Sequence, residues 1–570
     1  MSADQVSSES TGHLERWVPG IGMIRRYQPG WLRSDLVAGI VLAAILVPQG
    51  MAYAELAGLP AVNGLYATMA CLVGYALFGP SRILVLGPDS SLGPLILLAI
   101  LPLAITDDPA ELVVVAGMLA LLVAAIEIGL GLGKLGFVAD LLSKEVQVGY
   151  MIGLGITIIA GQLPKLFGFS TDADKFLDEV RAFFGGLDGR NSYTLAVGLA
   201  SLALLLILPR FTRRVPAVLI TVVLSTLAVA LFDLTDKGVT TVGSLPQGLP
   251  RPQFPSVALN DIGTLLAAAI GITLVSLADT IATSTSFAAK RGDEVNASQE
   301  MIGIGAANAF SGLFQGFPVS TSGSRTAVAE QAGAKSQVTG LIGAALVAIM
   351  LLFLPGLLAS LPNSALAAIV IAAALSLMDI PTVAKFLRVR VSSFVLAVAA
   401  TLGVVLFGVL EGILIAVTLS ILVFFKRNWW PTGQVLGRVD SLDSWHSLDA
   451  YPDAAQAPDV VVFRWEAPLF FANASIFRQE IRRLVNSSNA RWVVVQCEAI
   501  TDIDVTAADM LERLDSELNQ RGVHLVFVEL RSRLYDLVTR YGLLETLDQR
   551  HFYDSVDAAL TGIDTTARGR

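Results

Sequence analysis

The chain has 570 residues, of which 54% are hydrophobic and 15% are charged, and its mean hydropathy is +0.66. Soluble domains carry about 25% charged residues, so this composition excludes a soluble globular protein and indicates an integral membrane protein. The formal net charge of -9 is modest for this length and gives no reason to expect a nucleic-acid partner.

The chain opens with a polar segment, residues 1–34, that lacks the basic end, apolar core and cleavage site of a signal peptide. We therefore expect this segment to stay in the cytoplasm. Residues 35–427 contain apolar runs near spanning length, too many for a single membrane anchor. This region is predicted to be an α-helical polytopic transmembrane transport domain within the lipid bilayer.

The apolar region divides into about 14 helical segments, several of them short. Their predicted ranges in chain order are 35–52, 62–78, 89–104, 111–132, 146–163, 192–209, 215–232, 261–286, 299–313, 321–332, 336–360, 364–379, 392–408 and 409–426.

Basic residues support an even number of crossings. With the N-terminus inside, the even-numbered segments end inside, and basic residues then gather in the inner loops, as the positive-inside rule expects. These residues are Arg82, Arg210, Arg213, Arg214, Lys290, Arg291, Lys335, Lys385, Arg388, Arg390, Lys426 and Arg427. The pattern predicts a multi-pass protein of the cell (plasma) membrane with both termini in the cytoplasm.

The composition changes sharply after Trp430. Residues 428–457 carry Pro, Asp and Ser and are predicted to be a linker. Residues 458–565 are predicted to form a cytosolic α/β domain, because strand-like and helix-like segments alternate there. The strands are DVVVFRWEA, RWVVVQCEA and VHLVFVEL, and the helices between them are ANASIFRQEIRRLVNSS and TAADMLERLDSELNQRG.

Two polar sequences interrupt the apolar pattern at matching places. GPDSSLGP (87–94) opens the third predicted segment, and GFPVSTSGSRT (316–326) opens the tenth. In two halves of seven segments these are equivalent positions. Matched, short, Gly/Pro-interrupted segments in the two halves of a transporter indicate its substrate site.

The physical reason is the free end of a broken helix. Gly and Pro stop an extended segment, and Ser or Thr caps the half-helix that follows. The N-terminus of each half-helix carries partial positive charge and free N–H groups, so two such ends near the bilayer midplane would bind an anion. Arg325, one turn into the second half-helix, would add positive potential. The alternative is that both sequences are ordinary loops at membrane ends.

Two carboxylates need separate interpretations. Asp279 lies deep in the eighth predicted segment, where an acid is costly and is usually functional, and Thr283 follows on the same helix face. Together they would ligate Na⁺, or Asp279 would carry a proton; a structural pairing of the acid is the alternative. Asp89 is either a cap of the half-helix or a charge that repels the anion unless protonated or paired with a cation.

Other polar groups occur in the first segment. Gln49 and Tyr53, in VPQGMAYA, follow a Pro break and would line the same site, or else form hydrogen bonds between helices. Glu127 and Glu411 are acids in or near apolar segments without a surrounding motif.

Cysteine and histidine usage argues against metal chemistry. The chain has two cysteines and four histidines, and all the histidines lie outside the apolar runs. We expect no disulfide framework, no metal site and no cofactor beyond a coupling ion. No Ser–His, Cys–His or metal constellation is visible, so we expect no enzyme activity.

The sequence resembles the SulP family of anion transporters, the relatives of prestin and pendrin. The resemblance rests on PQGMAYAELAGLPAVNGLYAT (48–68), GPDSS, SLADTIATS and GSRTAVAEQAGAKSQVTG (323–340), and the tail is similar to a STAS domain. It covers the chain from about Trp31 to the end.

The resemblance implies a seven-plus-seven inverted repeat with a core domain (segments one to four and eight to eleven) and a gate domain, and a homodimer. The implied substrate-binding residues are Gln49, Tyr53, Asp89, Ser90, Ser322, Gly323, Ser324 and Arg325. The implied coupling-ion site, for Na⁺ or H⁺, is Asp279 with Thr283. Asp89 departs from the family, where a neutral residue is common, and this favours cation or proton coupling over simple exchange.

The STAS-like tail suggests a regulatory position. DIDVTAADML resembles the loop of anti-sigma antagonists that is phosphorylated on a serine, and Thr506 lies at that position, although Ala507 replaces the usual glycine. The alternative for Thr506 is helix capping. A cytosolic partner that binds the STAS domain is a further expectation.

The sequence as a whole predicts a secondary active transporter of a small anion (sulfate, bicarbonate, chloride or dicarboxylate). We expect coupling to H⁺ or Na⁺ and an elevator-like movement of core against gate. The alternatives are an uncoupled anion channel or exchanger and a membrane sensor that signals through the STAS domain.

Overall fold

The computed structural model describes residues 18–103, 108–136, 143–171, 176–211, 216–289, 294–547 and 551–568. The chain forms two compact units, Met1–Ser420 and Ile421–Arg570. Four of the predicted inner-loop basic residues lie outside the described residues; they are Arg213, Arg214, Lys290 and Arg291.

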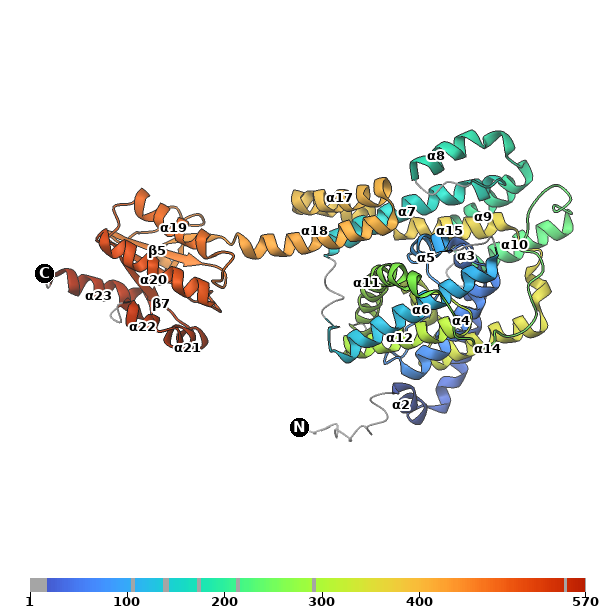
Figure 1. The fold of residues 1–570 in the computed structure, drawn as a ribbon, viewed down its shortest axis with the longest axis horizontal. Coiled ribbons are helices and arrows are strands. Elements are labelled where there is room, and N and C mark those ends of the chain that lie inside the picture. Colours follow the sequence, from blue (N-terminus) through green and yellow to red (C-terminus); the bar gives the residue numbers. More distant parts are fainter. Residues whose placement is uncertain are drawn as a thin grey trace. The chain divides into compact units, whose positions relative to one another are not determined.

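The first unit is almost entirely helical (Figure 1). Its first half contains α2 (Pro19–Arg25), α3 (Leu32–Leu56), α4 (Ala61–Phe78), β1 (Leu86–Gly87), α5 (Gly93–Ile100), α6 (Pro109–Leu132), α7 (Lys144–Phe167), α8 (Phe176–Gly185), α9 (Ser192–Phe211) and α10 (Ala217–Leu231). Its second half contains α11 (Leu259–Ala289), α12 (Ala297–Leu313), β2 (Ser320–Thr321), α13 (Gly323–Gln331), α14 (Val338–Phe353), α15 (Asn363–Leu377), α16 (Ile380–Val389), α17 (Val391–Phe407) and the start of α18 (Val409–Trp429), which continues into the second unit.

Each predicted helical segment corresponds to one of these helices. Among the described residues, seven helices are long and apolar enough to cross a membrane, and several shorter apolar helices accompany them. Three short helices, α2, α8 and α16, were not predicted, because each lies in a segment that reads as polar or mixed. The third segment also differs: its helix, α5, begins at Gly93 and not at residue 89.

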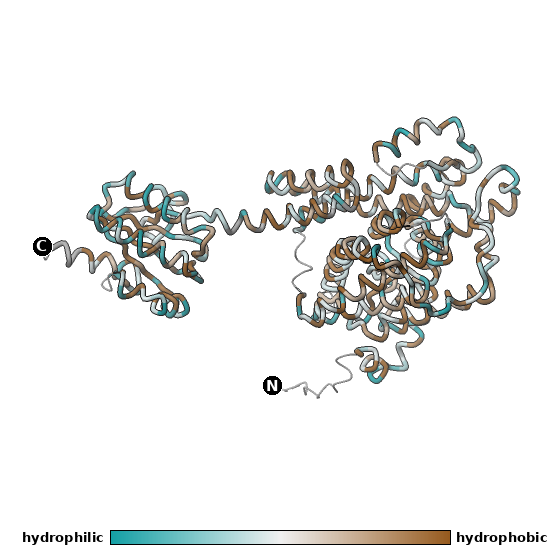
Figure 2. The backbone as a smooth tube through the Cα atoms, viewed as in Figure 1, coloured by the Kyte–Doolittle hydropathy of each residue, from teal (hydrophilic) through white to brown (hydrophobic). Residues whose placement is uncertain are grey.

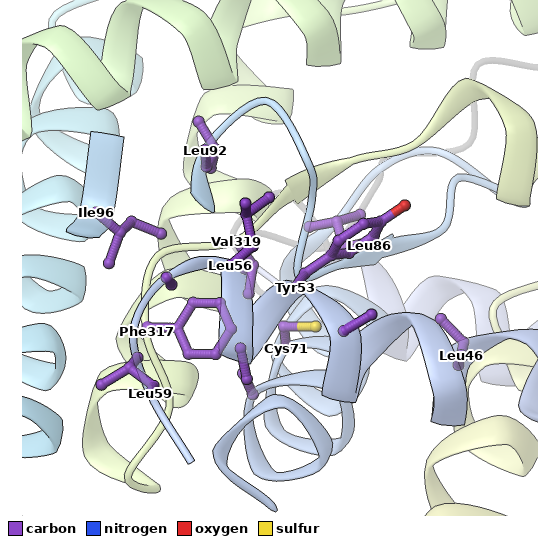
Figure 3. Packing of buried hydrophobic residues seen from close by; sticks show 14 of the residues in the cluster. Leu46, Tyr53, Leu56, Leu59, Cys71, Leu86, Leu92, Ile96, Phe317 and Val319 are labelled. Carbon is purple, nitrogen blue, oxygen red and sulfur yellow. The ribbon is translucent and has the colours of Figure 1, made fainter. Parts of the chain in front are cut away.

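The helices of the first unit pack as two bundles, as the family resemblance predicted. The core bundle contains α3, α4, α5, α6, α11, α12, α13 and α14, which contact one another across the two halves. The gate bundle contains α7, α9, α10, α15 and α17, with α16 beside α7 and α17. The core bundle buries apolar residues from both halves: Phe317 and Val319 pack beside Leu56 and Ile96 (Figure 3).

Hydrophobic residues are abundant along many helices of the first unit (Figure 2). Many large apolar side chains of the gate bundle are exposed, including Leu199, Leu206, Val223, Leu224, Val395 and Leu402. Apolar side chains on the outside of an apolar helix are the surface that a bilayer covers.

The second unit contains a six-stranded sheet in the order β4-β3-β5-β6-β7-β8. Its elements are β3 (Gly433–Val439), β4 (Ser444–Ser447), β5 (Val460–Trp465), α19 (Ala474–Ser487), β6 (Trp492–Gln496), α20 (Val505–Gln520), β7 (His524–Val528), α21 (Ser532–Arg540), α22 (Leu543–Thr546), β8 (Phe552–Tyr553) and α23 (Val556–Arg568).

The predicted buried strands are β5, β6 and β7, which pair in parallel. Their side chains alternate between two faces, as the period of a strand requires. Val461 and Phe463 face a core with α19 and α20, whereas Val460 and Val462 face a second core with α23.

The segment 428–457, predicted as a linker, contains two strands of this sheet. β3 pairs antiparallel with β4 and with β5, so the sheet begins well before residue 458. These two strands were not predicted, because they are short, half-buried and interrupted by Gly and Asp. Their sequences therefore show little of the alternation of apolar and polar residues that indicates a strand.

Candidate anion-binding site

The two polar breaks meet in space. β1 (Leu86–Gly87) lies where the first polar break begins, and β2 (Ser320–Thr321) lies within the second break, just before α13. The two strands pair antiparallel, Leu86 with Thr321 and Gly87 with Ser320. The ladder continues on one side, where the N–H of Ser322 donates to the carbonyl of Val85 at 3.1 Å. The prediction that equivalent breaks of the two halves come together is therefore confirmed by their pairing.

The second half-helix, α13, has the predicted cap. The hydroxyl of Ser322 accepts a hydrogen bond from the N–H of Arg325 at 3.5 Å and lies 3.0 Å from the hydroxyl of Ser324. Gly323 and Ser324 are exposed at the first turn, so their N–H groups are open to a ligand. A Cβ at Gly323 would lie 3.8 Å from the hydroxyl of Thr283, which places Thr283 beside this helix end.

The first half-helix, α5, begins differently from the prediction. Neither Ser90 nor Ser91 caps it; instead Asp89 accepts hydrogen bonds from the N–H and the hydroxyl of Ser91, at 3.0 and 2.8 Å. The carbonyl of Asp89 accepts from the N–H of Gly93 at 3.2 Å. The side chain of Asp89 thus forms an Asx-type turn before α5. Such a turn competes with the start of a helix at this position.

Arg325 lies between the two breaks. Its side chain is only 1% exposed, and one guanidinium nitrogen, Nη2, lies 3.4 Å from the carbonyl of Gly87 and 3.5 Å from the carboxylate of Asp89. Its Nε and Nη1 atoms are buried without a hydrogen-bond partner among the described residues. A buried cation with two unused donors is a site for a negatively charged ligand.

Asp279 of α11 lies on the other side of the same turn. Its carboxylate lies 3.3 Å from the hydroxyl of Ser91, the hydroxyl that also contacts Asp89. Gln147 and Tyr150, both on α7 of the gate bundle, lie within interaction range of Asp279. Asp279 therefore stands between the core and the gate, and Thr283, predicted as its partner, lies one turn further along the helix.

Tyr53 and Ser90 complete the predicted group. Both side chains are buried, and Tyr53 lies beside Ser90 and within electrostatic range of Asp89 and Arg325. In Figure 3 its ring lies next to Leu86 of β1. Gln49 is half-buried one turn earlier on α3, so it shares the helix face of Tyr53.

A buried hydrogen-bond chain holds the strand that precedes α13. Glu127 of α6 accepts from the hydroxyl of Ser276 at 2.9 Å and from the side-chain amide of Asn308 at 2.8 Å. The amide oxygen of Asn308 in turn accepts from the N–H of Val319 at 2.8 Å. Glu127, which no motif marked, thus fixes the approach to β2 through Asn308.

A second set of hydrogen bonds holds the segment after α13 and the segment before β1. Asp35 is fully buried and accepts from the N–H groups of Lys335 and Ser336, at 2.7 and 3.2 Å, at the start of α14. Gln337 donates to the carbonyls of Ser81 and Leu84, at 2.8 and 2.9 Å, just before β1. The segment after α13 and the segment before β1 are therefore each held by a residue from the other half of the chain.

Thr506 lies in the second unit. It is exposed in the first turn of α20, and Asp504, not Thr506, caps that helix by accepting from the N–H of Ala507 at 2.8 Å. The capping alternative for Thr506 is therefore wrong, and its regulatory role stays a prediction.

Sequence reasoning missed several members of the site. Ser91, Gln147, Tyr150 and Gly87 all lie at it, yet only Ser91 and Gly87 belong to the motif. Gln147 and Tyr150 belong to a different bundle, and their position follows from packing between bundles that no local pattern records.

Comparison with known families matches nearly the whole chain. The family model described as the sulfate permease family matches residues 32–400, and the STAS domain model matches residues 451–559. A probable sulfate transporter of Mycobacterium tuberculosis is 40% identical over 95% of this chain and 97% of that protein. The chloroplastic sulfate transporter 4.1 of Arabidopsis thaliana is 29% identical over 98% of this chain and 85% of that protein.

Solved structures have the same architecture. The structure of SLC26A9 matches with a TM-score of 0.88 and 25% identity, covering 97% of this chain and 93% of that chain. The transmembrane domain of the cyanobacterial bicarbonate transporter BicA matches in fold, with a TM-score of 0.61 and 22% identity over 69% of this chain and 98% of that chain.

Proposed function

The chain belongs to the sulfate permease family of anion transporters, and we propose that it is a secondary active transporter that moves a small oxyanion with a coupling proton. The observation that carries the proposal is the buried Arg325, whose Nε and Nη1 lack partners among the described residues, beside the paired half-helix ends.

Three kinds of donor would bind the proposed anion. The first is the open first turn of α13 at Gly323 and Ser324, and the second is the guanidinium of Arg325. The third is the hydroxyl pair of Ser322 and Ser324. Donors fixed by the backbone recognise an oxyanion without being reoriented, so they bind it at little entropic cost.

Sulfate is the substrate that we propose first. The support is the name and the 40% identity of the mycobacterial relative, a probable sulfate transporter. A guanidinium fork also matches the oxygen spacing of a tetrahedral oxyanion better than it matches a spherical ion. Bicarbonate, chloride and a dicarboxylate are the competing substrates in the test.

Proton coupling is supported by the arrangement around Ser91. The hydroxyl of Ser91 lies within hydrogen-bonding distance of two carboxylates, those of Asp89 and Asp279. A hydroxyl has one proton to donate, so the second contact needs a proton on one of the acids. We assign it to Asp279, because its contact with Ser91 is longer and Asp89 already pairs with Arg325. Na⁺ held by Asp279 near Thr283 is the competing assignment.

The proposal extends to orientation and movement. The basic residues of the inner loops favour cytoplasmic termini in the cell membrane, with the STAS domain on that side. Because Asp279 lies within interaction range of Gln147 and Tyr150 of the gate, a movement of core past gate would change its surroundings. Such an elevator-like movement in a homodimer, with a cytosolic partner on the STAS domain, is the working mechanism. An uncoupled channel would have no use for the acid at Asp279.

The test is radiolabelled sulfate uptake into proteoliposomes with an imposed pH or Na⁺ gradient. We expect an inward proton gradient to drive accumulation, and bicarbonate, chloride and dicarboxylate to compete weakly. Asp279→Asn should abolish gradient-driven accumulation while sulfate still binds. The control is Asp236→Asn, at an exposed acid in the loop between α10 and α11.

Three results would overturn parts of the proposal. Accumulation that follows only the Na⁺ gradient would replace the proton with Na⁺. Full proton-driven uptake by Asp279→Asn would remove the coupling role of Asp279. Equilibration without accumulation in the wild-type protein would indicate a channel or exchanger.

A further inference from the structure

A short helix of the gate bundle, α16 (Ile380–Val389), lies between the membrane helices α15 and α17. Its ten residues span about 15 Å, which is too short to cross a bilayer. It begins at Asp379, whose carboxylate accepts from the N–H of Thr382 at 3.1 Å, and it contacts α7 and α17. It is therefore a separate, capped helix fixed to the gate.

Packing against α7 and α17 does not bury all the apolar residues of α16. Val383 and Phe386 are half-buried, whereas Ile380 and Leu387 are 53% and 51% exposed. At 100° per residue, Ile380, Ala384 and Leu387 form one exposed strip beside the half-buried pair. An exposed apolar strip on a helix next to membrane spans is typical of a helix that lies in the bilayer interface.

Basic residues flank that strip. Lys385 and Arg388 lie on the neighbouring face of α16, and Arg390 follows its end; all three are exposed. Lys144, at the start of α7, is also exposed. It lies near the start of α17, because the adjacent Glu145 accepts a hydrogen bond from the hydroxyl of Ser393, in the first turn of α17, at 2.9 Å. Within the described part of the chain, none of these four basic side chains has a carboxylate within 4.0 Å or a hydrogen-bond partner.

The course of the next two helices indicates on which side of the membrane α16 lies. α17 leaves from the α16 side, and Gly412 of α18 packs against Val404 of α17, so α18 returns antiparallel toward that side. In the orientation proposed above this is the cytoplasmic leaflet, whose anionic lipids attract basic residues at the surface.

We propose that α16 and the four basic residues around it form a docking site for anionic phospholipids of this leaflet, which anchors the gate bundle. The apolar strip of Ile380, Ala384 and Leu387 inserts among the acyl chains. Lys385, Arg388, Arg390 and Lys144 bind the phosphate groups at the adjoining depth. An anchored gate gives the moving core a fixed surface, so transport depends on anionic lipid.

The first test is lipid binding to the full-length protein in mixed micelles, with native mass spectrometry to count retained phosphatidylglycerol and phosphatidylcholine. We expect the wild type to retain phosphatidylglycerol preferentially. The double variant Lys385→Gln/Arg388→Gln should lose about fivefold in relative affinity per basic residue, and so about 25-fold in all. The matched control, Arg190→Gln/Arg251→Gln, removes the same charge from exposed residues in loops at the opposite helix ends and should behave as wild type.

The second test separates lipid from free phosphate and charge from packing. Glycerol phosphate in excess should not displace phosphatidylglycerol, because it lacks acyl chains for the apolar strip. Lys385→Arg/Arg388→Lys should keep the preference, and Ile380→Ser/Leu387→Ser should lose it with the charges intact. Sulfate uptake at increasing phosphatidylglycerol content should rise for the wild type and the control but not for the charge-removed variant.

Equal retention of the two lipids by the wild type would overturn the proposal. So would an unchanged preference in Lys385→Gln/Arg388→Gln, or an equal loss in the control pair, which would assign the effect to net charge. Displacement by glycerol phosphate would reassign the site to a soluble phosphate compound.

Discussion

Gly87 and Arg325, from opposite halves of the chain, pack so closely that a Cβ atom at residue 87 would overlap the guanidinium of Arg325. A Cβ built on Gly87 would lie 2.7 Å from Nη1 of Arg325, the nitrogen that has no hydrogen-bond partner among the described residues. Nη2 of the same guanidinium lies 3.4 Å from the carbonyl of Gly87. The absence of a side chain at residue 87 is therefore what allows Arg325 to reach the first break.

Gly87→Ala should displace the guanidinium from the site. A contact under 3.0 Å cannot be kept, so either β1 or Arg325 shifts, and we expect sulfate affinity to fall by about tenfold or more, as when a charged hydrogen bond is lost. Isothermal titration with sulfate measures the change. Gly129→Ala, at a membrane-helix glycine with nothing within 4 Å of its added carbon, is the control. Wild-type affinity in Gly87→Ala would show that Arg325 does not contact the anion.

Ser324→Pro tests the backbone N–H groups of α13. Proline is tolerated in the first turn of a helix, so the fold should survive, but the N–H of residue 324 is lost. We expect sulfate affinity to fall by about 10- to 100-fold, the loss expected for a charge-assisted hydrogen bond. Ser324→Ala, which keeps the N–H, should bind within a few-fold of wild type. Normal sulfate binding by the folded proline variant would mean that the anion does not sit on this helix end.

Asp89→Asn should strengthen sulfate binding. Asp89 lies 3.5 Å from Arg325, so its negative charge opposes an anion in the same place. Asparagine keeps an oxygen that accepts from the N–H of Ser91, and the turn before α5 should persist. We expect binding at least about threefold tighter from removal of one nearby charge. Weaker binding, with the variant folded, would assign Asp89 a role in holding the anion through a coupling cation.

Patterns along the chain predicted the helix order and the two polar breaks, and the family resemblance implied the two bundles. The polar breaks at residues 87–94 and 316–326 stand out only because apolar residues surround them. The start of α5 was less predictable: Asp89 and two serines all cap helices well, and only the contacts of Ser91 decide among them. The role of Glu127 was invisible, because its partners Ser276 and Asn308 lie on other helices.

The buried chain from Glu127 to Val319 allows a graded test. Glu127→Gln keeps an acceptor for Asn308 and can donate to Ser276, so sulfate uptake should stay near wild type. Asn308→Leu leaves the N–H of Val319 and the carboxylate of Glu127 without their partner, which costs about 1–3 kcal/mol for each buried group. We expect a raised KM for sulfate with a smaller change in maximal rate, since β2 and α13 shift together.

Comparison of the two variants decides what the chain does. If Glu127→Gln lost transport as fully as Asn308→Leu, the carboxyl itself would be needed and not only its acceptor oxygen. If Asn308→Leu left KM unchanged, the strand before α13 would be held by other contacts.

Cys497 gives the second unit a pH-dependent stability. Burial raises the pKa of its thiol from 9.0 to about 12, so the folded state keeps the proton that the unfolded chain loses above pH 9. The thiol's contribution is therefore complete below pH 9 and is lost as pH rises toward 12, at up to about 1.4 kcal/mol per pH unit. Urea unfolding of the wild type and of Cys497→Val at pH 8 to 10.5 measures it.

The valine variant should show a smaller loss of unfolding free energy over that pH range, because it has no thiol to ionise. Other groups titrate equally in both proteins, so the difference between them isolates Cys497. Parallel curves for the two proteins would mean that the thiol becomes accessible to water before the unit unfolds.

The ladder between β1 and β2 also limits how the two half-helices can move. Leu86, Gly87, Ser320 and Thr321 are all buried, so drawing the two half-helices apart would leave their backbone groups without partners and without water. That rupture would destroy the binding surface in the same step. In the mechanism proposed above, the anion would therefore be held by a part of the core that stays intact through the cycle, and only the surfaces facing it, on α7 and its neighbours, would change.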